Sequence, residues 1–169
     1  MNSNLYKKAL NYGLRLLLHH SRTKFELERK LIIKAYSPEI CAQVIHQLSE
    51  WGYLDDKKFA ENYILSLKNK GIGKRKVYYS LLNKGITTEL ATETTEIEIN
   101  REKEIEQLAK AAEKKALYLL KKTEDIYNIN NVKGKLYRFL MGRGFPPSEI
   151  KGWIDANFQA ILDNIINKL

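Results

Sequence analysis

Apolar residues recur every three or four positions along most of the chain, which is the spacing of one face of an α-helix. Leu10, Leu14 and Leu17 follow this spacing before the chain breaks near His19-His20-Ser21. Further stripes are Ile40, Val44, Leu48 and Trp51; Phe59, Tyr63 and Leu67; Val77 and Leu81; Leu136 and Leu140; and Ile150, Ile154, Phe158, Leu162 and Ile165. Runs that alternate apolar and polar residues between hairpin turns, as strands do, are missing. The pattern predicts an all-α protein in which Trp51, Trp153 and Phe158 pack in a core or between repeats.

Helix-start and helix-stop residues fall between these stripes. Thr23 and Glu26 have the spacing of a capping box, and Ser37-Pro38 combines a cap with a proline at the first turn. Gly52 and Gly85 end helices, and either Asp55 or Asp56 caps the helix that follows Gly52. The break between the sixth and seventh helices falls within residues 96–101, and the Asn-rich stretch 123–131 predicts a loop. These boundaries predict nine helices.

The helical pattern repeats along the chain. Setting Ala35 against Gly85 aligns apolar positions at an offset of 50 residues, and Gly144 takes the place of Gly85 a further 59 residues on. Such self-similarity is typical of stacked helical repeats. We therefore expect three tandem three-helix repeats, residues 1–54, 55–100 and 101–169, forming an elongated, curved array.

The chain is basic, with a formal net charge of +9 that is spread unevenly. Segments 1–54, 55–95 and 130–169 carry +4, +3 and +3, whereas segment 96–129 carries −1. This distribution indicates polyanions or acidic protein surfaces as partners. The single Cys41 excludes an internal disulfide, no signal peptide is apparent, and no apolar run is long enough to cross a bilayer. We expect a soluble, cytoplasmic monomer that has no contact with membranes.

Two stretches of the chain carry basic residues and no acid. Residues 66–88 hold six basic side chains and residues 126–148 hold four. One equivalent position is also basic in each repeat, as Lys34, Lys84 and Arg143. This repetition favours a basic face that binds a partner or DNA, although a solvated surface would also explain it. The predicted binding residues are Arg22, Lys24, Lys34, Lys68, Lys70, Lys74, Arg75, Lys76, Lys84, Lys133, Lys135, Arg138 and Arg143. Tyr78 and Tyr137 are candidate aromatic contacts on the same face.

Motifs for catalysis, metal binding or cofactor binding are missing. Cys41 and the three histidines lack the paired spacing of a zinc site, and Asp55-Asp56 have no partner constellation for acid–base chemistry. The segment GIGK at residues 71–74 lacks the spacing and preceding strand of a phosphate-binding loop. We therefore expect no catalytic residues, no metal and no cofactor.

The ordered motifs resemble those of the bacterial RecX regulatory proteins. The resemblance rests on GYLDDKKFAENYI (residues 52–64), Ser21-Arg22-Thr23, GIGKRK (residues 71–76), and the turns at Lys84-Gly85-Ile86 and Arg143-Gly144-Phe145. It implies a non-enzymatic regulator, in DNA repair and the SOS response, that binds the RecA filament on single-stranded DNA and limits recombinase and coprotease activity. Two alternatives stay open: a protein that binds DNA or RNA independently of sequence, and a scaffold for an unrelated acidic protein.

Overall fold

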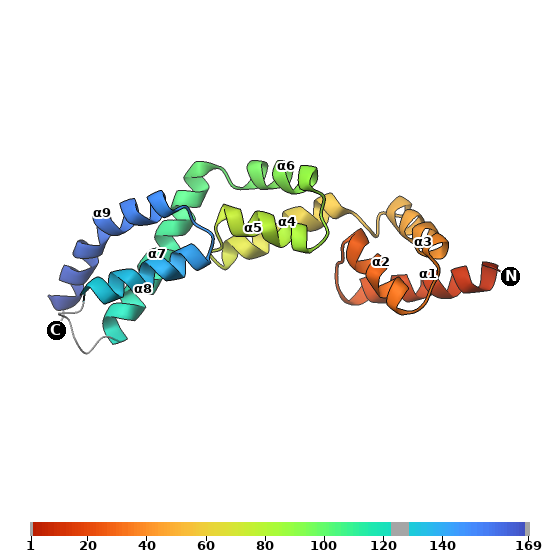
Figure 1. The fold of residues 1–169 in the computed structure, drawn as a ribbon, viewed down its shortest axis with the longest axis horizontal. Helices are drawn as coiled ribbons and strands as arrows, with labels where there is room; N and C mark the ends of the chain where they lie inside the picture. The colour runs from red at the N-terminus through yellow and green to blue at the C-terminus, as the bar shows by residue number, and fades with distance from the viewer. Residues whose placement is uncertain (1, 123–128, 168–169) are drawn as a thin grey trace. The chain divides into compact units, whose positions relative to one another are not determined.

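The computed structural model describes residues 2–122 and 129–167, and within these ranges it contains nine α-helices and no strand (Figure 1). The helices are α1 (Asn2–His19), α2 (Lys24–Ile33), α3 (Pro38–Glu50), α4 (Asp56–Asn69), α5 (Lys74–Asn83), α6 (Thr88–Glu98), α7 (Arg101–Lys122), α8 (Ile129–Gly142) and α9 (Pro147–Ile166). The predicted all-α array of three-helix repeats is confirmed. Its elongation and curvature stay predictions.

The chain packs as two compact units. The first unit comprises residues 1–63 and 79–94, and the second comprises residues 64–78 and 95–169. Helices α4 and α5 of the predicted middle repeat therefore contribute to both units. The predicted repeat boundaries at 54/55 and 100/101 fall in the turns before α4 and α7, and the division into three repeats at these positions stays a prediction.

The core of the first unit lies between α1, α2 and α3. Leu27 and Leu31 of α2 and Val44 and Leu48 of α3 are fully buried together with Ala9 of α1. The predicted capping box starts α2: the Thr23 hydroxyl oxygen accepts from the Glu26 N–H at 3.0 Å, and the Glu26 carboxylate accepts from the Thr23 N–H at 3.4 Å. The apolar spacing and the cap therefore act together to fix this helix.

The core of the second unit lies between α7, α8 and α9. Its buried side chains repeat at helical spacing on each element: Leu108, Ala112 and Ala116; Val132, Leu136 and Leu140; and Ile150, Ile154 and Phe158. The inward position predicted for Phe158 is confirmed. Three apolar helix faces therefore exclude water from one shared layer.

Two local predictions differ from the structure. Trp51 is not in a core: 51% of its surface is exposed, and its ring meets the edge of Tyr53 at 6.4 Å between centroids. Trp51 is the C-cap of α3, and Gly52 then reverses the chain with φ +75°, which takes the indole off the buried stripe. Residues 129–131 begin α8 instead of continuing a loop, and the rest of the predicted loop, 123–128, lies outside the described residues.

The helix breaks around α4 and α7 follow the sequence. The Asp55 carboxylate accepts from the Lys58 N–H at 3.0 Å and so caps α4 as predicted. Helix α6 ends and α7 begins within the predicted interval, and the Asn100 side chain accepts from the Lys103 N–H at 2.9 Å. None of the described helices is long and apolar enough to span a membrane.

Candidate functional site

Inside the first unit, the start of α2 is joined to the end of α5. The Thr23 hydroxyl donates to the Lys84 carbonyl at 2.7 Å, and the Lys84 ammonium pairs with the Glu26 carboxylate at 2.7 Å. Gly85 has φ +78° and lies directly against the Phe25 side chain, leaving no room for a Cβ. The Lys24 N–H also donates to Asp56 at 2.9 Å. We call this set of contacts the first joint.

Inside the second unit, the start of α5 contacts the end of α8 at the equivalent positions. The Gly73 N–H donates to the Arg143 carbonyl at 2.8 Å, and the Lys76 ammonium donates to the Gly142 carbonyl at 2.7 Å. A Cβ at Gly73 would lie 2.8 Å from the carbonyl carbon of Gly144. We call this set of contacts the second joint.

Charged groups complete the second joint. The Lys74 N–H donates to Glu104 of α7 at 3.0 Å, and the Lys74 ammonium pairs with Glu96 at 2.7 Å. The Arg143 guanidinium donates to the carbonyl oxygens of Lys70 and Gly71. Burial is the main reason that the pKa of Glu104 is raised, against the lowering effect of its contacts with Lys74.

The joints explain part of the predicted basic face. Lys84 and Arg143, which occupy the same position in successive repeats, each bond to groups of the preceding repeat within their own unit. Lys34, at the equivalent position of the first repeat, lies 5.9 Å from the centroid of the Tyr12 ring. The repeated basic position therefore has internal uses, and its role in binding a partner stays a prediction.

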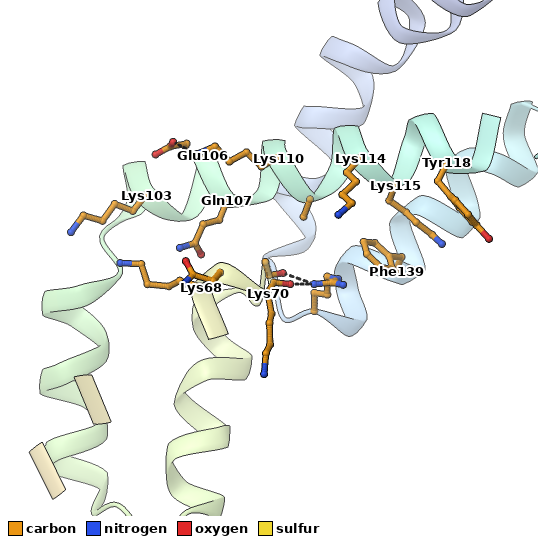
Figure 2. A pocket seen from close by; sticks show the side chains of 14 residues that line it. Lys68, Lys70, Lys103, Glu106, Gln107, Lys110, Lys114, Lys115, Tyr118 and Phe139 are labelled. Atoms are coloured by element: carbon orange, nitrogen blue, oxygen red, sulfur yellow. Dashed lines mark hydrogen bonds and ion pairs between the residues drawn. The ribbon is translucent and has the colours of Figure 1, made fainter. Parts of the chain in front are cut away.

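A basic groove in the second unit lies between α7, the end of α4 and α8 (Figure 2). Its volume is about 750 Å³. Lys114, Lys115 and Tyr118 extend from α7 toward Phe139, while Lys70 lies at the turn after α4. The basic residues that line it are Lys68, Lys70, Lys103, Lys110, Lys114, Lys115 and Arg143, and Glu106 is the one carboxylate in the lining. We call this feature the α7 groove.

The α7 groove is only partly neutralised from within. Glu106 accepts a hydrogen bond from Lys110 at 2.6 Å, and the same contact lowers the pKa of Glu106. Lys68 reaches Glu98 at 3.8 Å. Among the described residues, no carboxylate pairs with Lys70, Lys103 or Lys114, so the groove keeps an excess of positive charge.

The predicted binding residues therefore separate into several groups. Lys68, Lys70 and Arg143 meet in the α7 groove, whereas Lys74, Lys76 and Lys84 take part in the joints. Lys133 lies 5.2 Å from the Phe158 ring centroid, and the Nε of Arg22 is buried without a hydrogen-bond partner among the described residues. The exposed side chains are those of Lys24, Lys34, Lys70, Arg75, Lys76, Lys135 and Arg138. The candidate aromatics Tyr78 and Tyr137 are half-buried, and Tyr137 packs against the core of the second unit.

Sequence reasoning missed the contribution of α7 to the groove. Lys103, Lys110, Lys114 and Tyr118 follow one another at steps of seven, four and four residues, which places them along one helix face. The net charge of segment 96–129 hid this face because acids elsewhere on the same segment cancel its lysines in the sum. The helical spacing of the lysines was the signal that could have found it.

Other chemistry has little support in the described part of the chain. No group of three or more His, Cys, Asp or Glu side chains is placed to hold a metal ion there. Cys41 is fully buried, and burial is the main cause that raises the pKa of its thiol. A neutral buried thiol is a poor nucleophile.

The fold and the surface define a class: a basic protein built from three-helix repeats. Models of the first and second three-helix domains of RecX match residues 9–48 and 55–94. The regulatory protein RecX of Clostridium tetani is 35% identical over 86% of this chain and 65% of its own length. That of Pelodictyon phaeoclathratiforme is 36% identical over 89% of both chains. The chain belongs to the RecX family of regulatory proteins.

A solved structure supports the same fold. The crystal structure of RecX from Lactobacillus salivarius has a TM-score of 0.74 at 24% identity and covers 89% of this chain and 94% of that chain. The chain spans about two thirds of the length of several clostridial relatives. The family resemblance inferred from the motifs is thus confirmed.

Proposed function

We propose that this protein regulates the RecA recombinase by binding the RecA nucleoprotein filament on single-stranded DNA and limiting recombinase and coprotease activity. The observation that carries the proposal is the match of both RecX domains, in order, to the first six helices. The joints support it, because they hold consecutive repeats against each other within each unit. A chain with several linked binding faces suits a repeating filament, since each later contact forms at a high effective concentration.

The exposed basic residues outside the joints are the best candidates for contacts with the filament. Arg75, Lys135 and Arg138 are exposed, and they have no hydrogen bond or ion pair to other described residues. Changing them leaves the joints in place. We therefore assign the first contacts with acidic groups of the partner to these three side chains.

The proposal includes three further properties: the protein acts without catalysis, as a monomer, in the cytoplasm. The name of its relatives, regulatory protein, supports the first of these. Mass measurement in solution tests the second, and fractionation of cells tests the third.

A titration on growing and on preformed RecA filaments tests the proposal. We expect substoichiometric protein to reduce filament-dependent ATP hydrolysis and strand exchange, because one array spanning several subunits affects more subunits than it touches. The triple variant R75E/K135E/R138E is expected to act more weakly at unchanged helical content. If the intact protein leaves both filament populations unaffected, the proposal is wrong.

The α7 groove favours direct nucleic-acid binding as a second candidate function. Salt separates the two functions, because phosphate contacts weaken steeply as salt concentration rises. Binding to RecA filaments at a salt concentration that abolishes binding to bare single-stranded DNA supports the first function. If binding to RecA filaments and binding to bare single-stranded DNA are lost at the same salt concentration, the second function is supported. Binding to neither target supports a scaffold for another acidic protein.

A further inference from the structure

The lysines of the α7 groove form a row along one helix. Lys103, Lys110 and Lys114 are separated by seven and four residues, or about 10 Å and about 6 Å along the axis at the usual helical rise. Lys70 and Arg143 belong to the opposite wall. The row therefore presents positive charges in series along the groove.

These charges have few internal partners. Lys70 and Lys103 are exposed and, like Lys114, make no ion pair with another described residue. Glu106, the carboxylate of the lining, is already bonded to Lys110. Uncompensated charges lining a hollow surface concentrate the electrostatic field and raise the local concentration of a polyanion.

Aromatic rings lie at the far end of the row. Tyr118 keeps 53% of its surface exposed, with the Lys115 ammonium 4.5 Å from its centroid. Phe139 is covered by the Arg143 guanidinium at 4.4 Å and by Lys115 at 5.2 Å. Tyr118 is the more exposed of the two rings, and the Lys122 ammonium lies 6.0 Å from its centroid. A planar ligand therefore stacks on Tyr118 by displacing one of these two flexible lysine side chains.

We propose that the α7 groove is a binding site for a short segment of single-stranded nucleic acid. Lys103 and Lys114, which make no ion pair with another described residue, contact its phosphates, and one base stacks on Tyr118. From Lys103 to Tyr118 the helix covers about 22 Å at about 1.5 Å per residue, which accommodates a few nucleotides.

The chemistry of the groove favours this ligand over other polyanions. Lysine ammonium groups bind phosphates as point charges and need no bidentate geometry. A base offers a π-face to Tyr118, which an acidic peptide lacks and a duplex keeps stacked internally. The site rests on the second candidate function, direct nucleic-acid binding, and names its ligand and residues. Its test contains no RecA, so failure here leaves the RecA proposal standing.

The first experiment measures the anisotropy of a labelled oligothymidylate of about ten nucleotides over a range of salt concentrations. The variant K103Q/K114Q is expected to bind about tenfold more weakly or worse, with a salt slope smaller by about 1.4. The control K7Q/K8Q removes the same charge from exposed positions of α1 and is expected to bind like the unmodified protein. Equal losses for the two variants would mean that only net charge matters and would overturn the site.

The second experiment tests the stacking contact. Tyr118→Ala is expected to weaken binding about five- to a hundredfold, whereas Tyr118→Phe keeps the ring and binds nearly normally. Circular dichroism confirms that each variant keeps its helical content. Equal affinities of Tyr118→Ala and the unmodified protein would refute the stacking contact.

Competition identifies the ligand class. Unlabelled oligothymidylate is expected to displace the probe at lower concentrations than a duplex or a polyglutamate chain of equal charge. If polyglutamate competes equally well, the groove is a site for acidic peptides, and if the duplex does so, it is a general DNA surface. Either result contradicts the proposal.

Discussion

The two joints connect equivalent helices by different chemistry. In the first joint the Thr23 hydroxyl donates to the Lys84 carbonyl at the end of α5. In the second joint the backbone N–H of Gly73 donates to the Arg143 carbonyl at the end of α8. Glu26 of the first joint is replaced in the second by Lys76, and its partner changes from an ammonium group to a carbonyl oxygen. Equivalent geometry thus tolerates a reversal of charge. The repeated basic residues Lys84 and Arg143 are also bonded inside the joints. A charge that repeats in the sequence therefore does not by itself indicate a binding face.

The joints also differ in what makes the contact close. The first joint contains a partly buried ion pair, with 35% of the Lys84 side chain and 24% of the Glu26 side chain exposed. The second joint brings two backbones together at Gly73 and Gly144. We therefore expect glycine substitution to disturb both joints, at Gly85 against the Phe25 side chain and at Gly144 against the Lys76 backbone, and removal of the ion pair to affect the first. Trp51 in the first unit and Trp153 in the second allow unfolding of each unit to be followed separately.

Within the second joint, the largest effect is expected for Gly144→Ala. Gly144 has φ +87°, and a Cβ there would lie 2.7 Å from the Lys76 backbone nitrogen. Overpacking and left-handed strain add to a loss of about 2–5 kcal/mol. Denaturant unfolding followed by Trp153 fluorescence, in a Trp51→Phe background, measures it.

Gly52→Ala is the matched control for that loss, and because Gly52 lies in the first unit, Trp51 fluorescence in a Trp153→Phe background follows it. Gly52 has φ +75°, but a Cβ there would meet nothing within 4 Å. Only the conformational strain, about 1–2 kcal/mol, is expected. Equal losses at Gly52 and Gly144 would show that close packing at the second joint contributes nothing.

Gly73→Ala tests close approach without positive φ. A Cβ at this residue would lie 2.8 Å from the carbonyl carbon of Gly144, so backbone must move. We expect a loss of about 1–3 kcal/mol, measured as for Gly144→Ala. Gly134→Ala, in the interior of α8 with Arg138 as its nearest neighbour at 3.7 Å, is expected to be neutral or stabilising. A neutral result at Gly73 would contradict the geometry of the second joint.

Removing the ion pair of the first joint is expected to have a smaller effect. A double-mutant cycle of Glu26→Gln and Lys84→Met should give a coupling of about 1 kcal/mol, because the pair is only partly screened by water. Trp51 fluorescence, in a Trp153→Phe background, reports unfolding of the first unit. The pair Lys57–Glu93, with 57% and 55% of its side chains exposed, is the control and should couple near zero. Similar coupling in both cycles would remove the distinction between the joints.

The smallest effect is a pH dependence at the second joint. Because the folded pKa of Glu104 is raised above its ordinary value of 4.5, the folded state keeps a proton that the unfolded state has lost. The free energy of unfolding therefore falls as pH rises from the ordinary pKa of 4.5 through the raised pKa of Glu104 in the folded state. Glu104→Gln should remove this downward slope from unfolding curves measured over pH. The control is Glu106→Gln, which should remove an opposite slope, since the folded pKa of Glu106 is lowered. Parallel stability–pH profiles for Glu104→Gln and the unmodified protein would be inconsistent with this account.

Local features of the fold were predictable because their causes lie within one helix turn. The Thr23–Glu26 capping box and the cap at Asp55 join residues three positions apart. The apolar stripe was predicted to run from Ile40 to Trp51; it is buried as far as Leu48 and exposed at Trp51. Helical spacing extends the stripe to Trp51, although α3 ends at Glu50. Periodicity alone therefore overestimated the core.

The candidate site was less predictable than the fold. Lys70 and Arg143 were identified from acid-free stretches, but the lysines of α7 were not, because charge was summed along the chain and not around the helix. Internal uses of Lys76 and Lys84 were also missed. Their partners, Gly142 and Glu26, are 66 and 58 residues away in sequence.

By itself, the sequence determined the helices, their caps and the family, since periodicity, capping side chains and ordered motifs act over short stretches. Only the tertiary structure decided which basic side chains are bound internally and which remain available. The physical reason is that an ammonium group has the same charge in either case. Whether a carbonyl, a carboxylate or open solvent stands beside it depends on how helices distant in sequence pack together.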